Sequence, residues 1–167
     1  LFLKGSIKRI FSDTEIRWYV KTILLFTIII TIGLLLTSTM DIEEAFRKAS
    51  FLVISLQTTC GFITADYMQW APPLWMLTTV ITYCGACAGS TSGGIKCIRA
   101  VIMARIAKNE FMHILHPNAV LPVRVNGLSV SSITKSTVLA FFVVFVLLVF
   151  LGWFVMMIIG LDFDDAY

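Results

Sequence analysis

The sequence predicts an all-α polytopic membrane protein built from helix, re-entrant pore loop and helix repeats, with a broken inner helix. Of its 167 residues, 58% are hydrophobic, and the mean hydropathy is +0.90. Soluble domains are about 45–50% apolar, so a soluble protein is disfavoured. Residues 22–40, 67–95 and 136–161 carry no charge, and ~20 such residues cross ~30 Å of hydrocarbon as a helix.

The distribution of charge predicts the orientation of the chain. If the first spanning helix runs from inside to outside, every Lys and Arg except Arg47 and Lys48 lies inside, as the positive-inside rule expects. The acids outside favour a cation-selective vestibule, but acids also collect where basic residues are excluded, and charge alone leaves both interpretations open. These acids are Asp41, Glu43, Glu44, Asp66, Asp162, Asp164 and Asp165.

The first element is a spanning helix that follows a polar lead-in. Residues 1–15 do not resemble a signal peptide, and Leu1 stands where an initiator Met would, so we expect an internal fragment of a longer protein. Residues 18–39 then form the first spanning helix. Trp18 and Tyr19 lie at the interfacial depth that aromatic residues favour.

A helix too short to span is predicted next, capped by Asp41 and continuing through Ser55. Residues 57–62 follow as a polar, Gly-containing stretch between two charge-free runs. This pattern predicts a re-entrant hairpin that exposes backbone carbonyls, which membranes tolerate only where protein or water covers them. The partly negative end of the short helix points at this stretch and favours a cation there. Ion permeation is therefore the predicted function.

The second spanning segment is predicted to be discontinuous. Trp70 and the two prolines after it begin a helix that runs to about Cys84 and resumes at Ile95. Glycine costs about 1 kcal/mol against Ala inside a helix, so the intervening stretch should not be helical. Close helix packing by small residues is one interpretation. We favour an intramembrane loop that gates or lines a permeation path. Its key residues are Gly85, Gly89, Ser90, Thr91, Ser92, Gly93 and Gly94.

A cytoplasmic connection leads to the third spanning helix. It covers residues 109–135 and includes a small hairpin on a type I′ turn at Asn126-Gly127. The third spanning helix covers residues 136–160.

The chain offers little for catalysis or for a structural metal. Cys84 and Cys87 form a C-x-x-C without a second pair, so we expect buried, small apolar side chains there. His113 and His116 have no third ligand in reach. A phosphate-binding loop fails because Ile95 stands where that motif requires Lys. No enzyme and no covalent cofactor are therefore predicted.

The chain contains the start of an internal repeat. Residues 40–46, Met-Asp-Ile-Glu-Glu-Ala-Phe, match residues 161–167, Leu-Asp-Phe-Asp-Asp-Ala-Tyr, in chemical type at every position. One unit cannot close a pore, so further units are expected elsewhere in a longer protein, and we expect that the fragment does not fold alone. The predicted domains are a lead-in (1–15), a complete unit (16–108), a connection (109–135) and the start of the next unit (136–167).

Three motifs resemble the TrkH/KtrB/HKT superfamily of potassium transporters. Thr58 to Phe62, with Thr-Ala-Asp-Tyr at 64–67, resembles a filter loop. Gly-Ser-Thr-Ser-Gly-Gly-Ile-Lys at 89–96 and His-Pro-Asn-Ala-Val at 116–120 resemble the bacterial TrkH type. The resemblance implies four potassium-channel-like units around one pathway, of which this chain holds the third and the start of the fourth. It implies a selectivity filter at Thr58, Thr59, Cys60, Gly61 and Phe62, with potassium at Thr59 and Cys60.

The resemblance also implies partners and a location. It implies a homodimer in lipid, multi-pass in a bacterial inner membrane, with a cytoplasmic nucleotide-binding TrkA-type ring and no nucleic acid. Lys96 and Arg99 are candidates for coupling the Gly-rich loop to such partners, against simple positive-inside anchoring. Cys60 and Ser92 depart from the usual pattern of the superfamily. The alternatives are a secondary transporter of sodium or another small solute, a membrane-embedded enzyme and a non-conducting structural subunit.

Overall fold

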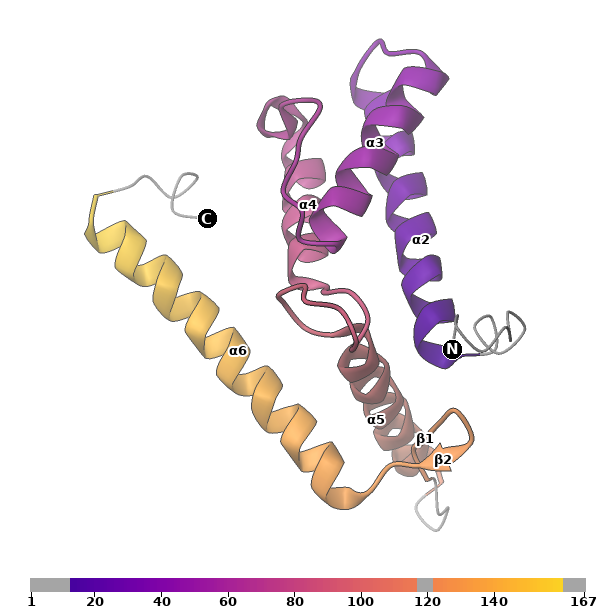
Figure 1. The fold of residues 1–167 in the computed structure, drawn as a ribbon. Coiled ribbons are helices and arrows are strands. Elements are labelled where there is room, and N and C mark those ends of the chain that lie inside the picture. The colour runs from indigo at the N-terminus through magenta and orange to yellow at the C-terminus, as the bar shows by residue number, and fades with distance from the viewer. Residues whose placement is uncertain (1–12, 117–121, 161–167) are drawn as a thin grey trace. The chain divides into compact units, whose positions relative to one another are not determined.

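The computed structural model describes residues 13–116 and 122–160, and the chain divides into two compact units, Leu1–Val101 and Ile102–Tyr167. The second copy of the repeated heptapeptide, at 161–167, therefore lies outside the described residues. The first unit holds α2 (Thr14–Thr37), α3 (Ile42–Gln57), the 3-10 turn η2 (Tyr67–Gln69), α4 (Pro72–Tyr83) and the start of α5 (Cys97–Leu115) (Figure 1). The second holds the rest of α5, β1 (Arg124–Val125), β2 (Leu128–Ser129) and α6 (Ser132–Ile158).

Helix α2 begins four residues earlier than the sequence predicted. Asp13 is its N-cap, and the Asp13 side chain accepts a hydrogen bond from the backbone N–H of Glu15 at 2.8 Å. Hydroxyls along the helix donate to carbonyls one turn back, as that of Thr31 does to Thr27 at 2.7 Å. The hydroxyls of Thr22, Thr31 and Thr37 are satisfied in this way, whereas the buried Oγ1 of Thr27 has no hydrogen-bond partner among the described residues.

Helix α3 packs between α2 and α4 (Figure 1). Its small residues Ala45 and Ala49 are fully buried at helical spacing, which lets the three helices approach closely. The prediction that the Asp41 side chain caps α3 is wrong: Asp41 is the N-cap residue but makes no capping hydrogen bond. This end of the helix is exposed, so water can reach its N–H groups. The core contains Ile30, Leu34, Ala45, Ala49, Val53, Leu74 and Ile81.

Helix α4 has only 12 residues, about 18 Å of rise, and does not reach across a bilayer. Its two prolines occupy the first turn, where a missing N–H costs little. Gly33 of α2 permits its approach, because a Cβ there would lie 2.3 Å from Leu74 Cδ2. No helix is described between Tyr83 and Cys97.

The second unit confirms the hairpin and the last helix of the prediction. Asn126 and Gly127 both have positive φ, of 50° and 82°, as a type I′ turn requires. The last helix, α6, starts at Ser132 rather than 136, because the Ser131 hydroxyl accepts from the N–H of Thr134 and begins the helix there. Val138 is the only residue of α6 recorded as buried.

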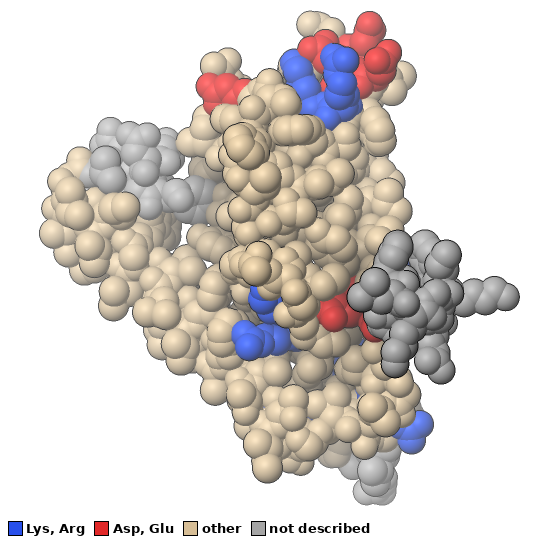
Figure 2. Space-filling view, in the orientation of Figure 1, with Lys and Arg blue, Asp and Glu red and all other residues tan. Residues whose placement is uncertain are grey.

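Two helices, α2 and α6, are long and apolar enough to cross a membrane by length and composition. Only 6% of the most apolar 18-residue stretch of α6 is buried. This exposure does not fit the core helix of a soluble protein. It fits a surface that lipid or other helices cover. Figure 2 shows a broad band without charge below the charged cluster at the start of α3.

Candidate functional site

The chain turns back after Ser38, at the C-terminal end of α2, and α3 runs alongside α2 toward Thr22. The loop after α3 then returns to the C-terminal end of α2, which is called the near end. At the far end of α3, Gln57 Nε2 donates to Thr22 Oγ1 at 2.9 Å. Thr64 and Asp66 then line a pocket together with Ser38 at the near end. Ser38 and Thr22 are separated by roughly 24 Å along α2, at ~1.5 Å per residue. Residues 42–66 thus form a hairpin that enters and leaves at one end of the unit.

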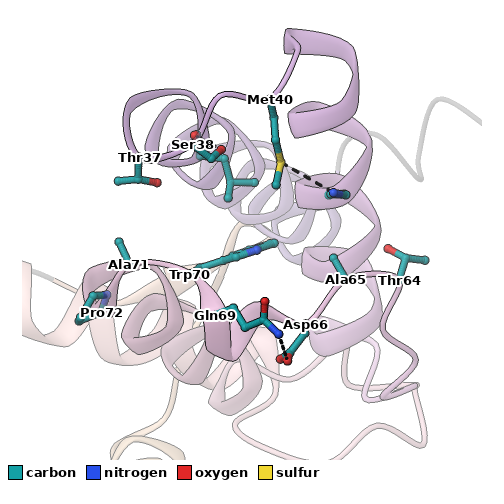
Figure 3. Close-up of a pocket in the computed structure, with 12 residues that line it drawn as sticks. Thr37, Ser38, Met40, Thr64, Ala65, Asp66, Gln69, Trp70, Ala71 and Pro72 are labelled. Carbon is teal, nitrogen blue, oxygen red and sulfur yellow. Dashed lines mark hydrogen bonds between the residues drawn. The ribbon is translucent and has the colours of Figure 1, made fainter.

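A pocket of about 680 Å³ lies at the near end of this hairpin (Figure 3). Asp66 accepts hydrogen bonds there from Gln69 Nε2 at 2.9 Å and from the N–H of Met68, and these bonds fix the return of the loop. Lys48 also lines the pocket and pairs with Glu44 at 2.6 Å, and this hydrogen bond lowers the pKa of the Glu44 carboxyl. The other lining residues are Leu34, Thr37, Ser38, Met40, Thr64, Ala65, Trp70, Ala71 and Pro72.

Helix α3 ends in a Schellman motif that sets the direction of the predicted filter loop. The helix runs to Gln57, two residues beyond the prediction. The N–H of Cys60 donates to Ser55 O at 2.9 Å and that of Thr59 to Leu56 O at 3.0 Å, which is the bond pair of this motif. The N–H groups of Thr58 and Gly61 also donate into the last turn of α3. Four successive loop N–H groups therefore point back into the helix.

Thr59 adopts a backbone conformation that its side chain disfavours. Its φ is +57°, and a β-branched residue in the left-handed region is an outlier that costs on the order of 1–2 kcal/mol. Schellman motifs normally place Gly at this position. Such strain collects at functional sites, where it supports a hypothesis of function.

Relief of this strain is measurable. Thr59→Gly in the full-length protein is expected to stabilise the folded state by roughly 1 kcal/mol, because Gly adopts positive φ freely. Thermal unfolding of the purified protein in detergent measures this, with Thr58→Gly as the control, since Thr58 has φ −82°. An equal fall of the Tm in Thr59→Gly and Thr58→Gly would contradict the claim that the backbone of Thr59 is strained.

The carbonyl oxygens of the loop divide into two groups. Phe62 O accepts from the hydroxyl of Ser55 at 2.6 Å, and Ser55 is almost fully buried. Among the residues that the structure describes, no hydrogen bond is donated to the carbonyl oxygens of Thr58, Thr59, Cys60 or Gly61. Residues 58–63 are exposed, so this part of the loop is open to water or to a ligand. The role of Ser55 was missed from the sequence, where it appeared only as the end of a helix.

The Gly-rich stretch forms a closed loop. Cys84 and Ile95 pair as a parallel bridge, in which Gly85 N–H donates to Ile95 O and Ile95 N–H to Tyr83 O, both at 2.9 Å. A Cβ on Gly85 would lie 2.4 Å from Gly93 O, so only Gly fits there. Helix α5 begins at Cys97 rather than at the predicted Ile95, because Ile95 takes part in this pairing.

The side chains of Ser92 and Lys96 lie on the same loop. Ser92 Oγ is buried and accepts from the N–H of Ala86 at 3.1 Å. Lys96 Nζ donates to Ser90 O and Ser92 O, each at 2.6 Å. Arg99 lies in the first turn of α5, and its N–H donates to Lys96 O. Of the predicted loop residues, Ser90 and Ser92 come together here. A Cβ on Gly89 or Gly93 would meet nothing within 4 Å.

The loop also contacts the start of α2, which the sequence did not indicate. Glu15 Oε1 accepts from the N–H of Ala88 at 2.6 Å, across 73 positions of the chain. Cys97 Sγ lies 3.7 Å from Glu15 O. The loop is thus held at one end by α2.

The cysteine and histidine predictions have mixed outcomes. Cys84 and Cys87 are half-buried rather than buried. Cys97 is buried and Cys60 is exposed. His113 is exposed near the end of α5, and within 13–116 and 122–160 no group of three metal-binding side chains occurs.

Comparison with solved structures identifies the class of protein. The crystal structure of the potassium transporter TrkH from Vibrio parahaemolyticus matches with a TM-score of 0.91 and 28% identity, over 99% of this chain and 36% of that one. The fold is therefore that of a helical membrane transporter. The family model of TrkH, described as a cation transport protein, matches residues 14–164. This chain belongs to the TrkH family.

Curated relatives agree with this assignment. The Trk system potassium uptake protein TrkH of Halomonas elongata is 36% identical over 94% of this chain and 33% of that protein. The Trk system potassium uptake protein TrkG of Escherichia coli K12 is 30% identical over 96% of this chain and 33% of that protein. The chain spans about a third of the length of these relatives.

Proposed function

We propose that the full-length protein to which this chain belongs takes up potassium ions across a bacterial inner membrane. Residues 58–62 form one strand of its selectivity filter, and residues 85–94 form its gate. In this proposal α3 is a re-entrant pore helix, and α4 and α5 are the two halves of a broken inner helix. The names of the curated relatives, which are potassium uptake proteins, support the choice of ion.

The observation that carries the proposal is the orientation of the backbone after α3. The N–H groups of residues 58–61 all donate back into the helix, and the four carbonyl oxygens of these residues accept no hydrogen bond within the described part of the chain. Rings of backbone carbonyls can replace the hydration shell of potassium. The negative end of α3 lies at the same place and adds a favourable field for a cation. Potassium at Thr59 and Cys60 is the corresponding ion site.

The remaining units and partners follow from the same proposal. Four units, three of them largely outside this chain, close the pathway, and two copies of the protein form a homodimer. A TrkA-type ring regulates the gate from the cytoplasm, with Lys96 and Arg99 at the start of α5 as coupling residues. Uptake by this route needs no catalytic group.

The filter assignment predicts a large loss of transport on Gly61→Asp. Gly61 has φ +78°, and a side chain there strains the backbone and introduces a carboxylate among the carbonyl oxygens. Rubidium flux into liposomes containing the full-length protein is expected to fall by roughly 100-fold or more, because the coordinating ring is disrupted. Sodium is added as a competitor.

Gly127→Asp is the matched control. Gly127 also has positive φ, of +82°, and open space around it, but it lies in the β1–β2 turn. The rubidium flux of the Gly127→Asp protein is expected to equal that of the wild type. Unchanged rubidium flux in Gly61→Asp would show that residues 58–62 are not the selectivity filter. Flux that sodium carries equally well would keep the pore and remove the potassium selectivity.

A further inference from the structure

The Gly-rich loop contains a positive charge that is held by the oxygens of the loop itself. Lys96 Nζ lies 2.6 Å from Ser90 O, 2.6 Å from Ser92 O and 3.5 Å from Ser92 Oγ. An ammonium has three donors and no acceptor, and here all three have oxygen partners on one short segment. These bonds are charge-assisted, which makes them about twice as strong as neutral ones.

Ser92 connects this charge to the two ends of the loop. Its hydroxyl oxygen accepts from the N–H of Ala86 at the start of the loop, and its own N–H donates to Ser90 Oγ at 3.2 Å. Ser92 is 7% exposed. A movement that draws Ser90 and Ser92 away from the start of α5 would therefore break the contacts of Lys96. A movement that draws Ala86 away from Ser92 would break the hydrogen bond between them.

We propose that Lys96 is a positioning residue that latches the Gly-rich loop in its closed, non-conducting conformation. This inference rests on the proposed gate. The ammonium holds two carbonyl oxygens that would otherwise turn toward water or toward a permeating cation, since backbone carbonyls at membrane depth need a partner. The latch joins Lys96 at the start of α5 directly to the loop, so a movement of α5 along its axis would be transmitted to the gate.

Lys96→Met in the full-length protein tests the latch, because Met keeps a similar unbranched stem and removes the ammonium. Rubidium flux into liposomes is expected to rise by roughly tenfold, which corresponds to about 1.4 kcal/mol in the equilibrium between the closed and open loop. A single hydrogen bond to a charged group contributes at least that much. The ratio of rubidium to sodium flux should not change, since the filter is intact. Lys108→Met, an equal change of charge at an exposed position of α5, should leave the flux unchanged.

A second measurement reports the loop without using transport. Cys97 is buried beside the loop, so its rate of modification by a maleimide in nanodiscs, read by peptide mass spectrometry, follows loop opening. This rate is expected to rise with the flux in Lys96→Met and, less strongly, in Ser92→Ala, which leaves both carbonyl contacts of Lys96 in place. Lys96→Arg keeps the charge and supplies N–H donors for both carbonyl oxygens, so it should retain most of the wild-type protection.

The possible results separate the latch from the filter. A Lys96→Met protein with unchanged Cys97 modification and unchanged or lower flux overturns the latch. If Gly61→Asp leaves flux intact while Lys96→Met exposes Cys97, the filter assignment fails and the latch stands. If Lys96→Met does not fold, Lys96→Gln, which also removes the charge, takes its place, and an unchanged rate of Cys97 modification in that variant overturns the proposal.

Discussion

Replacing Gly85 with Ala in the full-length protein is expected to open the Gly-rich loop. The new Cβ would lie 2.4 Å from Gly93 O and 3.2 Å from Ile95 O. Both are backbone atoms that cannot rotate away, so the pairing of Cys84 with Ile95 must shift. Overpacking of this kind costs roughly 1–3 kcal/mol or more, which corresponds to at least about a fivefold change in the loop equilibrium. The expected result is faster modification of Cys97 together with raised rubidium flux.

Gly89→Ala provides the matched control for that result. A Cβ on Gly89 meets nothing within 4 Å, and its backbone does not have positive φ. The substitution removes a glycine from the same loop without a clash, so both rates should stay within a factor of about two of the wild type. Equal effects of the two substitutions would show that chain flexibility, rather than the close contact at Gly85, determines the loop conformation.

Ser55→Ala is expected to reduce the discrimination between rubidium and sodium. The buried Ser55 hydroxyl holds Phe62 O at 2.6 Å, while Ser55 O accepts from the N–H of Cys60. Loss of the hydroxyl leaves a carbonyl without its donor, at a cost of about 1–3 kcal/mol, and frees the outer end of the loop. We expect the flux ratio of rubidium to sodium to fall by roughly tenfold in liposomes, with the total flux changed less.

Ser50→Ala removes a hydroxyl from the same helix without touching the loop. Ser50 Oγ donates to Arg47 O at 3.1 Å, within α3. Its flux ratio should match the wild type. A normal ratio in Ser55→Ala would mean that Phe62 O is held by other groups of the full-length protein, and the positioning role of Ser55 would be wrong.

Much of the fold could be predicted because its signals are local. Charge-free runs located α2 and α6, and the Asn126-Gly127 pair located the hairpin, since each depends on residues adjacent in the chain. The ends of the helices were less accurate. Helix α6 begins before its predicted start because Ser131 caps it. Helix α5 begins after its predicted start because Ile95 pairs with Cys84 on the other side of the loop.

The sequence predicted where the candidate site lies but not the contacts that its residues make. The sequence placed both loops correctly because glycines and hydroxyl residues interrupt apolar runs there. It gave Lys96 as a candidate for coupling the loop to other proteins, which stays a prediction, and it did not indicate that the ammonium binds two carbonyl oxygens of the loop. It gave no indication of Glu15, whose carboxylate holds Ala88, because 73 positions separate the two residues and only the packing of α2 brings them together.

The sequence by itself determined the membrane class, the order of the helices and the positions of the two irregular loops. Hydropathy, charge and glycine content act over a few residues and need no knowledge of neighbours in space. The tertiary structure alone decided how the two loops are held against the rest of the unit. Gln57, just before the first loop, donates to Thr22 of α2, and the N–H of Ala88 in the second loop donates to Glu15 of α2. Such contacts depend on how α2 packs against the later segments, because a hydrogen bond requires its partners within about 3 Å.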